Sequence, residues 1–197
     1  MPALHAFALL LLLATAPMLN AAPRDAVKPK WRTPYDLYLT PREAYQKKLV
    51  AGASILLIDV RTRAELKYIG MADAVDANIP VRMLRDDYAW SAKSETYRTR
   101  ENPNFVGAVD RLLQLKGLNR NSPIILMCQS GSRAPIGARL LHRAGFGEVY
   151  TQYQGFEGFK AKQGPDQGHR IVNGWKNAKL PWSYQLDAAK MYFNFAP

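Results

Sequence analysis

Residues 124–135 read IILMCQSGSRAP and contain Cys128, the only cysteine in the chain of 197 residues. The first four residues form a short, continuous apolar run, which is typical of a buried strand. A helical pattern begins around Pro135, a residue that suits the first turn of a helix. Cys128 is therefore expected on a short loop between the end of a strand and the start of a helix.

A loop in this position suits a bound anion. The backbone N–H groups at a helix start have no partner within the helix, and the helix dipole is positive there. The dipole contributes about 0.3–1 kcal/mol, whereas each hydrogen bond to a charged group contributes about 1.5–3 kcal/mol. The loop amides therefore matter more than the dipole. Ser130, Gly131, Ser132 and Arg133 also favour a stabilised thiolate, or a larger anion attached to it, over a core thiol.

The remainder of the chain reads as alternating strands and helices. A continuous apolar strand is expected over 55–60, and a capping box with proline begins a helix at Thr40 that runs toward Gly52. A helix is expected to begin near Asn102 and to end at Gly117. Its apolar face consists of Phe105, Val109, Leu112 and Leu113. The helix after the cysteine loop is expected to carry an apolar stripe of Ile136, Leu140 and Ala144 and to end at Gly145. This alternation predicts an α/β fold with a mostly parallel central sheet and helices on both faces.

The loop 128–133 resembles the active loop Cys-x-x-Gly-x-Arg of the rhodanese-like sulfurtransferases. Further segments resemble that family in the same order, so the resemblance covers roughly residues 35–182. These segments are Ile58-Asp59-Val60-Arg61 with Glu65, Asn78-Ile79-Pro80, Gly145-Phe146 through Tyr150, Gly155-Phe156-Glu157-Gly158, Asn173-Gly174-Trp175 and Leu180-Pro181. The resemblance implies a rhodanese-like domain.

The chain departs from the family pattern in three places. Met71 stands where the family often has histidine. Residues 82–104 form a long polar connection, and residues 159–173 look like a further insertion. Long loops in compact domains are often functional, so these segments are candidates to cover the active loop and set the substrate.

The resemblance implies sulfur transfer by a ping-pong route. Cys128 is the expected nucleophile, and it carries the sulfur as a persulfide held by loop amides and the hydroxyls of Ser130 and Ser132. Arg133 is expected to orient an anionic donor, and Gln129 to shape the entrance. Arg61 is a further candidate for substrate binding, with a structural ion pair as the alternative. Asp59 and Glu65 read as structural residues, Glu65 as the partner of a nearby arginine. No cofactor and no metal is expected.

The N-terminus predicts export to the periplasm or beyond. Residues 1–22 lack charged side chains and contain an apolar run followed by Asn20-Ala21-Ala22, which is the pattern of a cleavable signal peptide. The apolar run is too short for a membrane span. Residues 23–34 are expected to form a flexible lead, and the apolar tail 183–197 to dock on the domain.

A single cysteine cannot form an internal disulfide, so the sulfur must leave to an external acceptor.

The charge balance indicates the partners. The net charge is +11, which favours small anionic sulfur donors or an acidic partner protein. The expected acceptor is a thiol, cyanide or an exported protein, and no nucleic-acid recognition motif is visible. A periplasmic sulfur carrier or partner-docking module with little small-molecule turnover is the alternative.

Two other enzyme classes have less support. A cysteine–histidine hydrolase would need His169, on the second insertion, to fold back to the loop. A phosphatase of related fold would need arginine at position 134, which is alanine.

Overall fold

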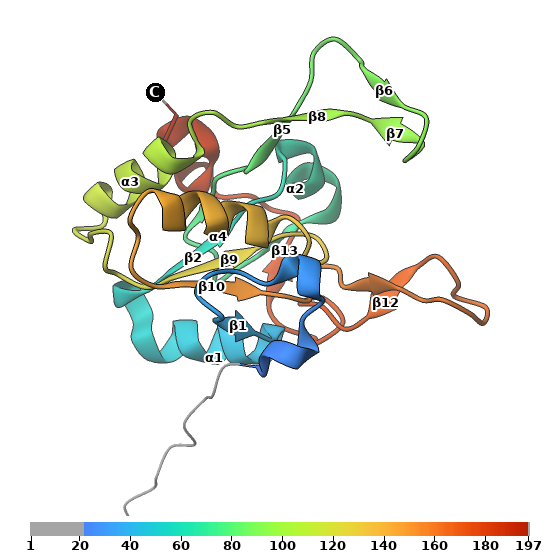
Figure 1. The fold of residues 1–197 in the computed structure, drawn as a ribbon, viewed down its shortest axis with the longest axis horizontal. Helices are drawn as coiled ribbons and strands as arrows, with labels where there is room; N and C mark the ends of the chain where they lie inside the picture. The colour runs from blue at the N-terminus through green and yellow to red at the C-terminus, as the bar shows by residue number, and fades with distance from the viewer. Residues whose placement is uncertain (1–21, 197) are drawn as a thin grey trace, which may run out of the picture.

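The computed structural model describes residues 22–196, and its centre is a sheet of five parallel strands (Figure 1). The strands in spatial order are β1 (Tyr38–Leu39), β10 (Val149–Gln152), β9 (Ile124–Met127), β2 (Leu56–Asp59) and β4 (Ala77–Asn78). Every neighbouring pair in this order is parallel. All but one residue of the predicted signal segment, residues 1–22, lie outside the described part.

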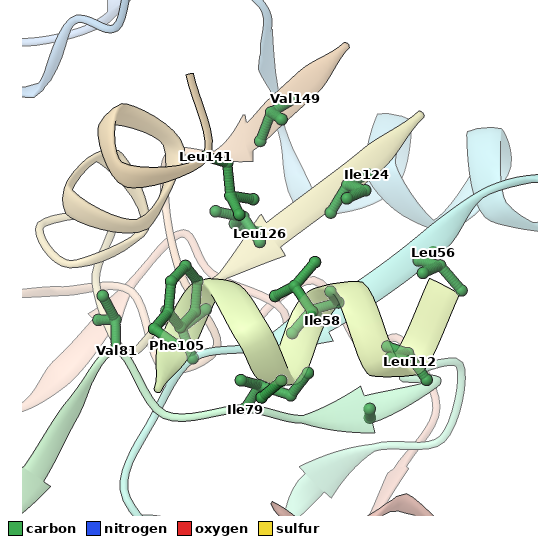
Figure 2. Packing of buried hydrophobic residues seen from close by; sticks show 14 of the residues in the cluster. Leu56, Ile58, Ile79, Val81, Phe105, Leu112, Ile124, Leu126, Leu141 and Val149 are labelled. Carbon is green, nitrogen blue, oxygen red and sulfur yellow. The ribbon is translucent and has the colours of Figure 1, made fainter. Parts of the chain in front are cut away.

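Helices cover both faces of this sheet. They are α1 (Pro41–Ala51), α2 (Arg63–Ile69), α3 (Phe105–Leu115) and α4 (Ala134–Arg143). Leu56 and Ile58 of β2 pack with α3 and α4, as Figure 2 shows. Leu57, between them, faces the opposite side and belongs to a second cluster with α1 and α2. The alternation follows from the two-residue period of a strand. The predicted α/β fold, with a parallel sheet covered on both faces, is confirmed.

Side-chain caps begin the two helices on the α1 and α2 side. In α1 the hydroxyl of Thr40 accepts a hydrogen bond from the backbone of Glu43, whose carboxylate accepts one from the backbone of Thr40. Thr62 and Glu65 form the same reciprocal pair at the start of α2. Such boxes satisfy N–H groups that have no partner in the helix. The predicted start of the helix at Thr40 is confirmed, as is its end at Gly52.

The prediction that the apolar stripe of α4 faces the core is wrong, because other residues of the helix are buried more deeply. Ile136, Leu140 and Ala144 are only partly buried, at the edge of the core. The fully buried positions include Ala134 and Ala138, together with Leu141. Small residues face the sheet because the helix lies close to it. A Cβ on Gly137, for example, would lie 3.0 Å from atoms of Leu126 and Phe105.

The two expected insertions form projecting hairpins (Figure 1). In the first, β5 (Arg82–Leu84) pairs antiparallel with β8 (Thr99–Glu101), and β6 (Trp90–Ser91) with β7 (Thr96–Tyr97). We call residues 82–101 the arm. In the second insertion β11 (Phe159–Lys160) pairs with β12 (Arg170–Val172). A separate short pair joins β3 (Met71–Ala72) to β13 (Trp182–Ser183).

Both ends of the described chain lie against the domain. The residues expected to form a flexible lead instead make two short turns, η1 (Arg24–Ala26) and η2 (Pro29–Trp31), and bury Val27 against Tyr38. The burial of this apolar side chain accounts for the difference. The other short turns are η3 (Gly52–Ser54), η4 (Ala188–Lys190) and η5 (Tyr192–Asn194). Phe195 in the tail is buried in the cluster with α3 and α4. No helix within residues 22–196 is long and apolar enough to cross a bilayer.

Candidate functional site

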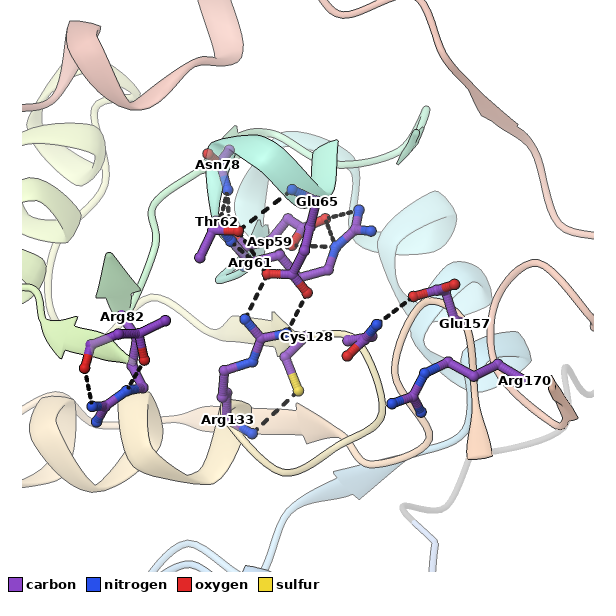
Figure 3. A network of polar contacts seen from close by, with 12 residues as sticks. Asp59, Arg61, Thr62, Glu65, Asn78, Arg82, Cys128, Arg133, Glu157 and Arg170 are labelled. Atoms are coloured by element: carbon purple, nitrogen blue, oxygen red, sulfur yellow. Dashed lines mark hydrogen bonds and ion pairs between the residues drawn. The ribbon is translucent and has the colours of Figure 1, made fainter. Parts of the chain in front are cut away.

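Cys128 lies at the carboxyl end of β9, the middle strand of the sheet, and α4 begins six residues later (Figure 3). Ligands of open α/β sheets bind at this edge. The side chain of Cys128 is fully buried. The backbone N–H of Arg133 donates a hydrogen bond to its Sγ at 3.3 Å. The sulfur therefore sits inside the loop, with the first turn of the helix beside it.

The expected cradle of donors is only partly formed around the sulfur. The Arg133 amide is the one hydrogen-bond donor to Sγ within the part of the chain that the structure describes. Ser130 and Ser132 are half-buried. Their hydroxyls form no hydrogen bond with any residue from 22 to 196. These two hydroxyls are therefore uncommitted donors in the same loop as the buried thiol.

The segment after β10 holds the first half of the loop. The backbone N–H of Phe156 donates to the carbonyl of Cys128 at 2.7 Å, and that of Glu157 to the carbonyl of Gln129 at 3.0 Å. The side-chain amide of Gln129 donates to the Glu157 carboxylate at 2.6 Å. Gln129 is thus tied down at both its backbone and its side chain. This fixes the direction in which the loop leaves the sheet.

Two glycines allow the loop and this segment to approach each other. Gly131 has a φ of +85°, and a Cβ there would lie 1.8 Å from the carbonyl oxygen of Tyr153. Gly155 has a φ of +74°, and a Cβ there would lie 2.3 Å from backbone atoms of Gln129 and Ser130. Other residues strongly disfavour this left-handed conformation. Each glycine therefore permits a backbone contact that any side chain would block.

The guanidinium of Arg133 is held by Glu65 across the loop (Figure 3). Both guanidinium ends bind the carboxylate, with Nη1 at 2.7 Å from Oε2. Thr62 donates to Oε2 from its backbone at 3.0 Å and from its hydroxyl at 2.8 Å. The expectation that Glu65 pairs with a nearby arginine is confirmed. Arg133 reaches Cys128 through its backbone, while its side chain is engaged elsewhere.

The pair stays charged although both side chains are mostly buried, with 18% and 17% of their surfaces exposed. Burial alone would raise the pKa of Glu65, but the hydrogen bond and charge of Arg133 and the bonds from Thr62 lower it below its ordinary value. Burial likewise opposes the charge on Arg133, yet Glu65, and then Cys128, raise its pKa. Arg133 therefore stays charged beside its paired carboxylate.

Arg61 forms a buried ion pair, which was the structural alternative to a role in substrate binding. Its side chain is fully buried and binds the Asp59 carboxylate through Nε at 3.0 Å and Nη2 at 2.6 Å. Nη2 also donates to the carbonyl of Gly70, and the guanidinium lies 4.1 Å from the ring centroid of Phe156. Nη1 has no hydrogen-bond partner among residues 22–196. Its role in substrate binding stays a prediction.

The positions of the histidines lend no support to a cysteine–histidine hydrolase. His169 lies on the β11–β12 hairpin with 74% of its side chain exposed. His142, on α4, packs edge-on against Tyr35. Among residues 22–196 no cluster of three or more His, Cys, Asp or Glu side chains could hold a metal ion.

Sequence reasoning missed how the loop is held from outside. Phe156 and Glu157 were noted as part of a family-like segment, but their bonds to Cys128 and Gln129 were not predicted. The glycine on each side of the contact was the available signal, since glycine often marks close backbone approach. Which two segments approach each other follows from the strand order, because β10 and β9 are neighbours in the sheet.

Comparisons with known proteins agree with this architecture. A family model described as the rhodanese-like domain matches residues 42–162, more than half of the chain. The crystal structure of Rv0390 from M. tuberculosis is similar, with 28% identity, 75% of this chain and 97% of that chain covered, and a TM-score of 0.52.

Two more distant similarities were found. One is to the solution structure of a polysulfide-sulfur transferase homodimer from Wolinella succinogenes, at 25% identity and a TM-score of 0.40, over 74% of this chain and 77% of that chain. The other is to an uncharacterized protein of Rickettsia conorii, at 24% identity over 69% of this chain and 89% of the relative. On the family match, the chain belongs to the rhodanese-like domain family, as the loop resemblance predicted.

Proposed function

We propose that this protein is a sulfurtransferase that carries a sulfane sulfur on Cys128. The supporting observation is the position of the thiol in a Cys-x-x-Gly-x-Arg loop, at the carboxyl end of β9, with the Arg133 N–H on Sγ. Family membership supports sulfur chemistry at this loop. The proposal adds the nucleophile, the type of donor and the order of steps.

The first step loads the cysteine. The Cys128 thiolate attacks the outer sulfur of thiosulfate or of a persulfide. A new S–S bond forms, the bond between the two donor sulfur atoms breaks, and its electron pair leaves with sulfite or a thiolate. The product is a Cys128 persulfide. Its terminal sulfur lies beyond Sγ, and the uncommitted hydroxyls of Ser130 and Ser132 are side-chain donors that the loop can offer it.

The second step unloads the cysteine. Cyanide or a thiol attacks the terminal sulfur, the Cys128 S–S bond breaks, and its electron pair returns to Sγ as thiolate. The product is thiocyanate or a new persulfide. The chain has one cysteine, so the acceptor comes from outside. Cys128 is fully buried, which favours small or thin reactants.

The test is intact-protein mass spectrometry. Incubation with thiosulfate is expected to add one sulfur atom to the wild type, and cyanide is expected to remove it. Cys128→Ser keeps the size of the side chain but replaces the thiol with a much weaker nucleophile. This variant is expected to show neither the added sulfur nor turnover. Sulfur transfer by Cys128→Ser, or no added sulfur on the wild type with several donors, would contradict the proposal.

We also propose that the reaction takes place after export. The support is the uncharged, apolar segment over residues 1–22 with small residues at its end. N-terminal sequencing of the protein from an exported fraction is expected to start near residue 22. An intact Met1 on protein recovered from the cytoplasm would rule this out.

A sulfur carrier that docks on another protein is the second candidate. The observation that favours it is the tip of the arm, where Tyr88, Trp90 and Tyr97 are 80%, 54% and 59% exposed. Exposed aromatic side chains are enriched at interfaces between proteins. If this candidate holds, the wild type gains sulfur but turns over cyanide slowly, and removing the arm aromatics impairs delivery to a protein acceptor without affecting loading.

A further inference from the structure

A cavity lies between α2, the arm and the C-terminal tail. Its volume is about 390 Å³, within the range of about 300–1,000 Å³ that is typical of small-molecule sites. None of the six residues of the Cys128 loop lines it, although Thr62 in its lining also binds Glu65, the partner of Arg133. Two of its three walls belong to the first insertion and to the tail, which lies beyond the family match at residues 42–162.

The walls of the cavity are mainly apolar. The apolar side chains come from all three elements and include Leu66, Met83, Leu84, Leu186, Met191 and Phe193. Leu84, Leu186 and Phe193 expose 38%, 37% and 69% of their surfaces. Large apolar side chains that converge on one hollow, rather than being scattered, mark a binding site. An apolar ligand body would cover them.

The polar groups at the base of the cavity are already engaged. The hydroxyl of Thr62 donates to Glu65 at 2.8 Å. The side-chain amide of Asn78 donates to the carbonyls of Asp59 and Arg61, at 2.9 and 2.8 Å. A ligand body that reaches this depth therefore finds these donors occupied, which favours an apolar body there.

The charged groups of the cavity are arginines from two elements and one carboxylate. Arg63 at the start of α2 and Arg100 on β8 both line the cavity and are exposed. Neither side chain forms an ion pair or hydrogen bond with another residue from 22 to 196. Asp86 is the single acidic lining residue, so the lining carries one net positive charge.

We propose that this cavity binds a small organic anion with an apolar body, such as a medium-chain or aromatic carboxylate. The apolar body packs between α2 and the tail, and the anionic end meets Arg63 and Arg100. Neither arginine must give up a protein partner to bind it. The proposal does not require sulfur transfer, because the residues assigned to the ligand, Arg63, Arg100 and the apolar walls, are not residues of the Cys128 loop.

The experiment compares three probes of equal chain length by isothermal titration calorimetry. Octanoate, octan-1-ol and octylammonium share an apolar body and differ in the charge of the head group. Octanoate is expected to bind with a dissociation constant of about 1 mM or lower, and octylammonium at least about tenfold more weakly. Equal affinity for octanoate and octylammonium, or no binding of octanoate near 1 mM, would overturn the proposal.

Variants assign the binding to this cavity. Met83→Glu adds a carboxylate to an apolar wall and is expected to abolish octanoate binding. Arg100→Ala is expected to weaken it about two- to fivefold, the size of an exposed charge pair. Arg98→Ala is the matched control, since Arg98 lies on the arm, is exposed and does not line the cavity. Equal effects of the two arginine variants would contradict the assignment.

Three further measurements complete the design. Phe193→Ala changes an exposed residue and should leave folding intact, so a loss of octanoate affinity in that variant supports the site even if Met83→Glu does not fold. Cys128→Ser is expected to bind octanoate as the wild type does, which separates this proposal from sulfur transfer. Sedimentation analysis tests the rival occupant, a second copy of the chain. A dimer that Phe193→Ala dissociates, with no octanoate bound, would overturn the proposal.

Discussion

Replacement of Gly131 by alanine tests whether the active loop depends on close contact with the segment after β10. Gly145→Ala is the matched control. Gly145 has nearly the same φ, +81° against +85°, but a Cβ there meets no atom within 4 Å. The control therefore measures the cost of the left-handed conformation alone, about 1–2 kcal/mol. The difference between the two variants isolates the contact.

The contact should add about 1–3 kcal/mol to the loss of stability. A Cβ at position 131 lies 1.8 Å from the carbonyl oxygen of Tyr153, whereas ordinary contact begins near 3.4 Å. The backbone must move by more than an ångström, which strains the bonds from Phe156 and Glu157 to the loop carbonyls. Each such bond contributes about 0.5–1.5 kcal/mol. Adding these to the conformational cost gives a loss of about 2–5 kcal/mol for Gly131→Ala.

Two assays measure the effect. Urea unfolding gives the loss of free energy for each variant, and the thiosulfate–cyanide reaction gives kcat/KM. A displacement of this size is expected to lower kcat/KM of Gly131→Ala about 100-fold, with Gly145→Ala close to wild type. Equal losses of stability in the two variants, together with unchanged kcat/KM for Gly131→Ala, would refute the reasoning.

Three further predictions concern charge. Arg133→Ala is expected to raise KM for thiosulfate more than it lowers kcat, measured by steady-state kinetics; an unchanged KM would limit Arg133 to its structural bond with Glu65. The folded state lowers the pKa of Glu65 below 4.5, so the pair adds stability above that pH and loses it as the pH falls through the lowered value. Unfolding free energies from pH 6 to about pH 3 should therefore fall less steeply for Glu65→Gln than for the wild type. Finally, kcat/KM for thiosulfate should decrease as salt increases, because the donor is an anion and the chain carries a net charge of +11; a flat response would place the basic residues away from the entrance.

Features encoded within a few neighbouring residues were predictable from the sequence. The capping box at Thr40, the apolar strand before Cys128 and the helix after it were all expected, and the structure contains each of them. A strand period and a cap depend on side chains two to four positions apart, so they can be read along the chain. The loop could be recognised for the same reason, since its six residues are consecutive.

The face that α4 buries was not predictable in the same way. A search for large apolar residues selects Ile136 and Leu140, but the core side consists of small residues such as Ala134 and Ala138. At Gly137, on the same helix, a Cβ would already lie 3.0 Å from Phe105 and Leu126, so the space beside the helix is filled. That space is defined by residues from α3 and β9, which no pattern within α4 contains.

The sequence by itself thus determined the class of fold, the identity of the loop and the position of its cysteine. Only the tertiary structure decided which groups surround that loop. Arg133 meets Glu65 across 68 positions of the chain, and Gly131 meets Tyr153 across strands β9 and β10. The cavity beside α2 likewise needs α2, the arm and the tail together. Contacts of this kind depend on the order of strands in the sheet and on the paths of the connections, which local periodicity and hydrogen bonding do not specify.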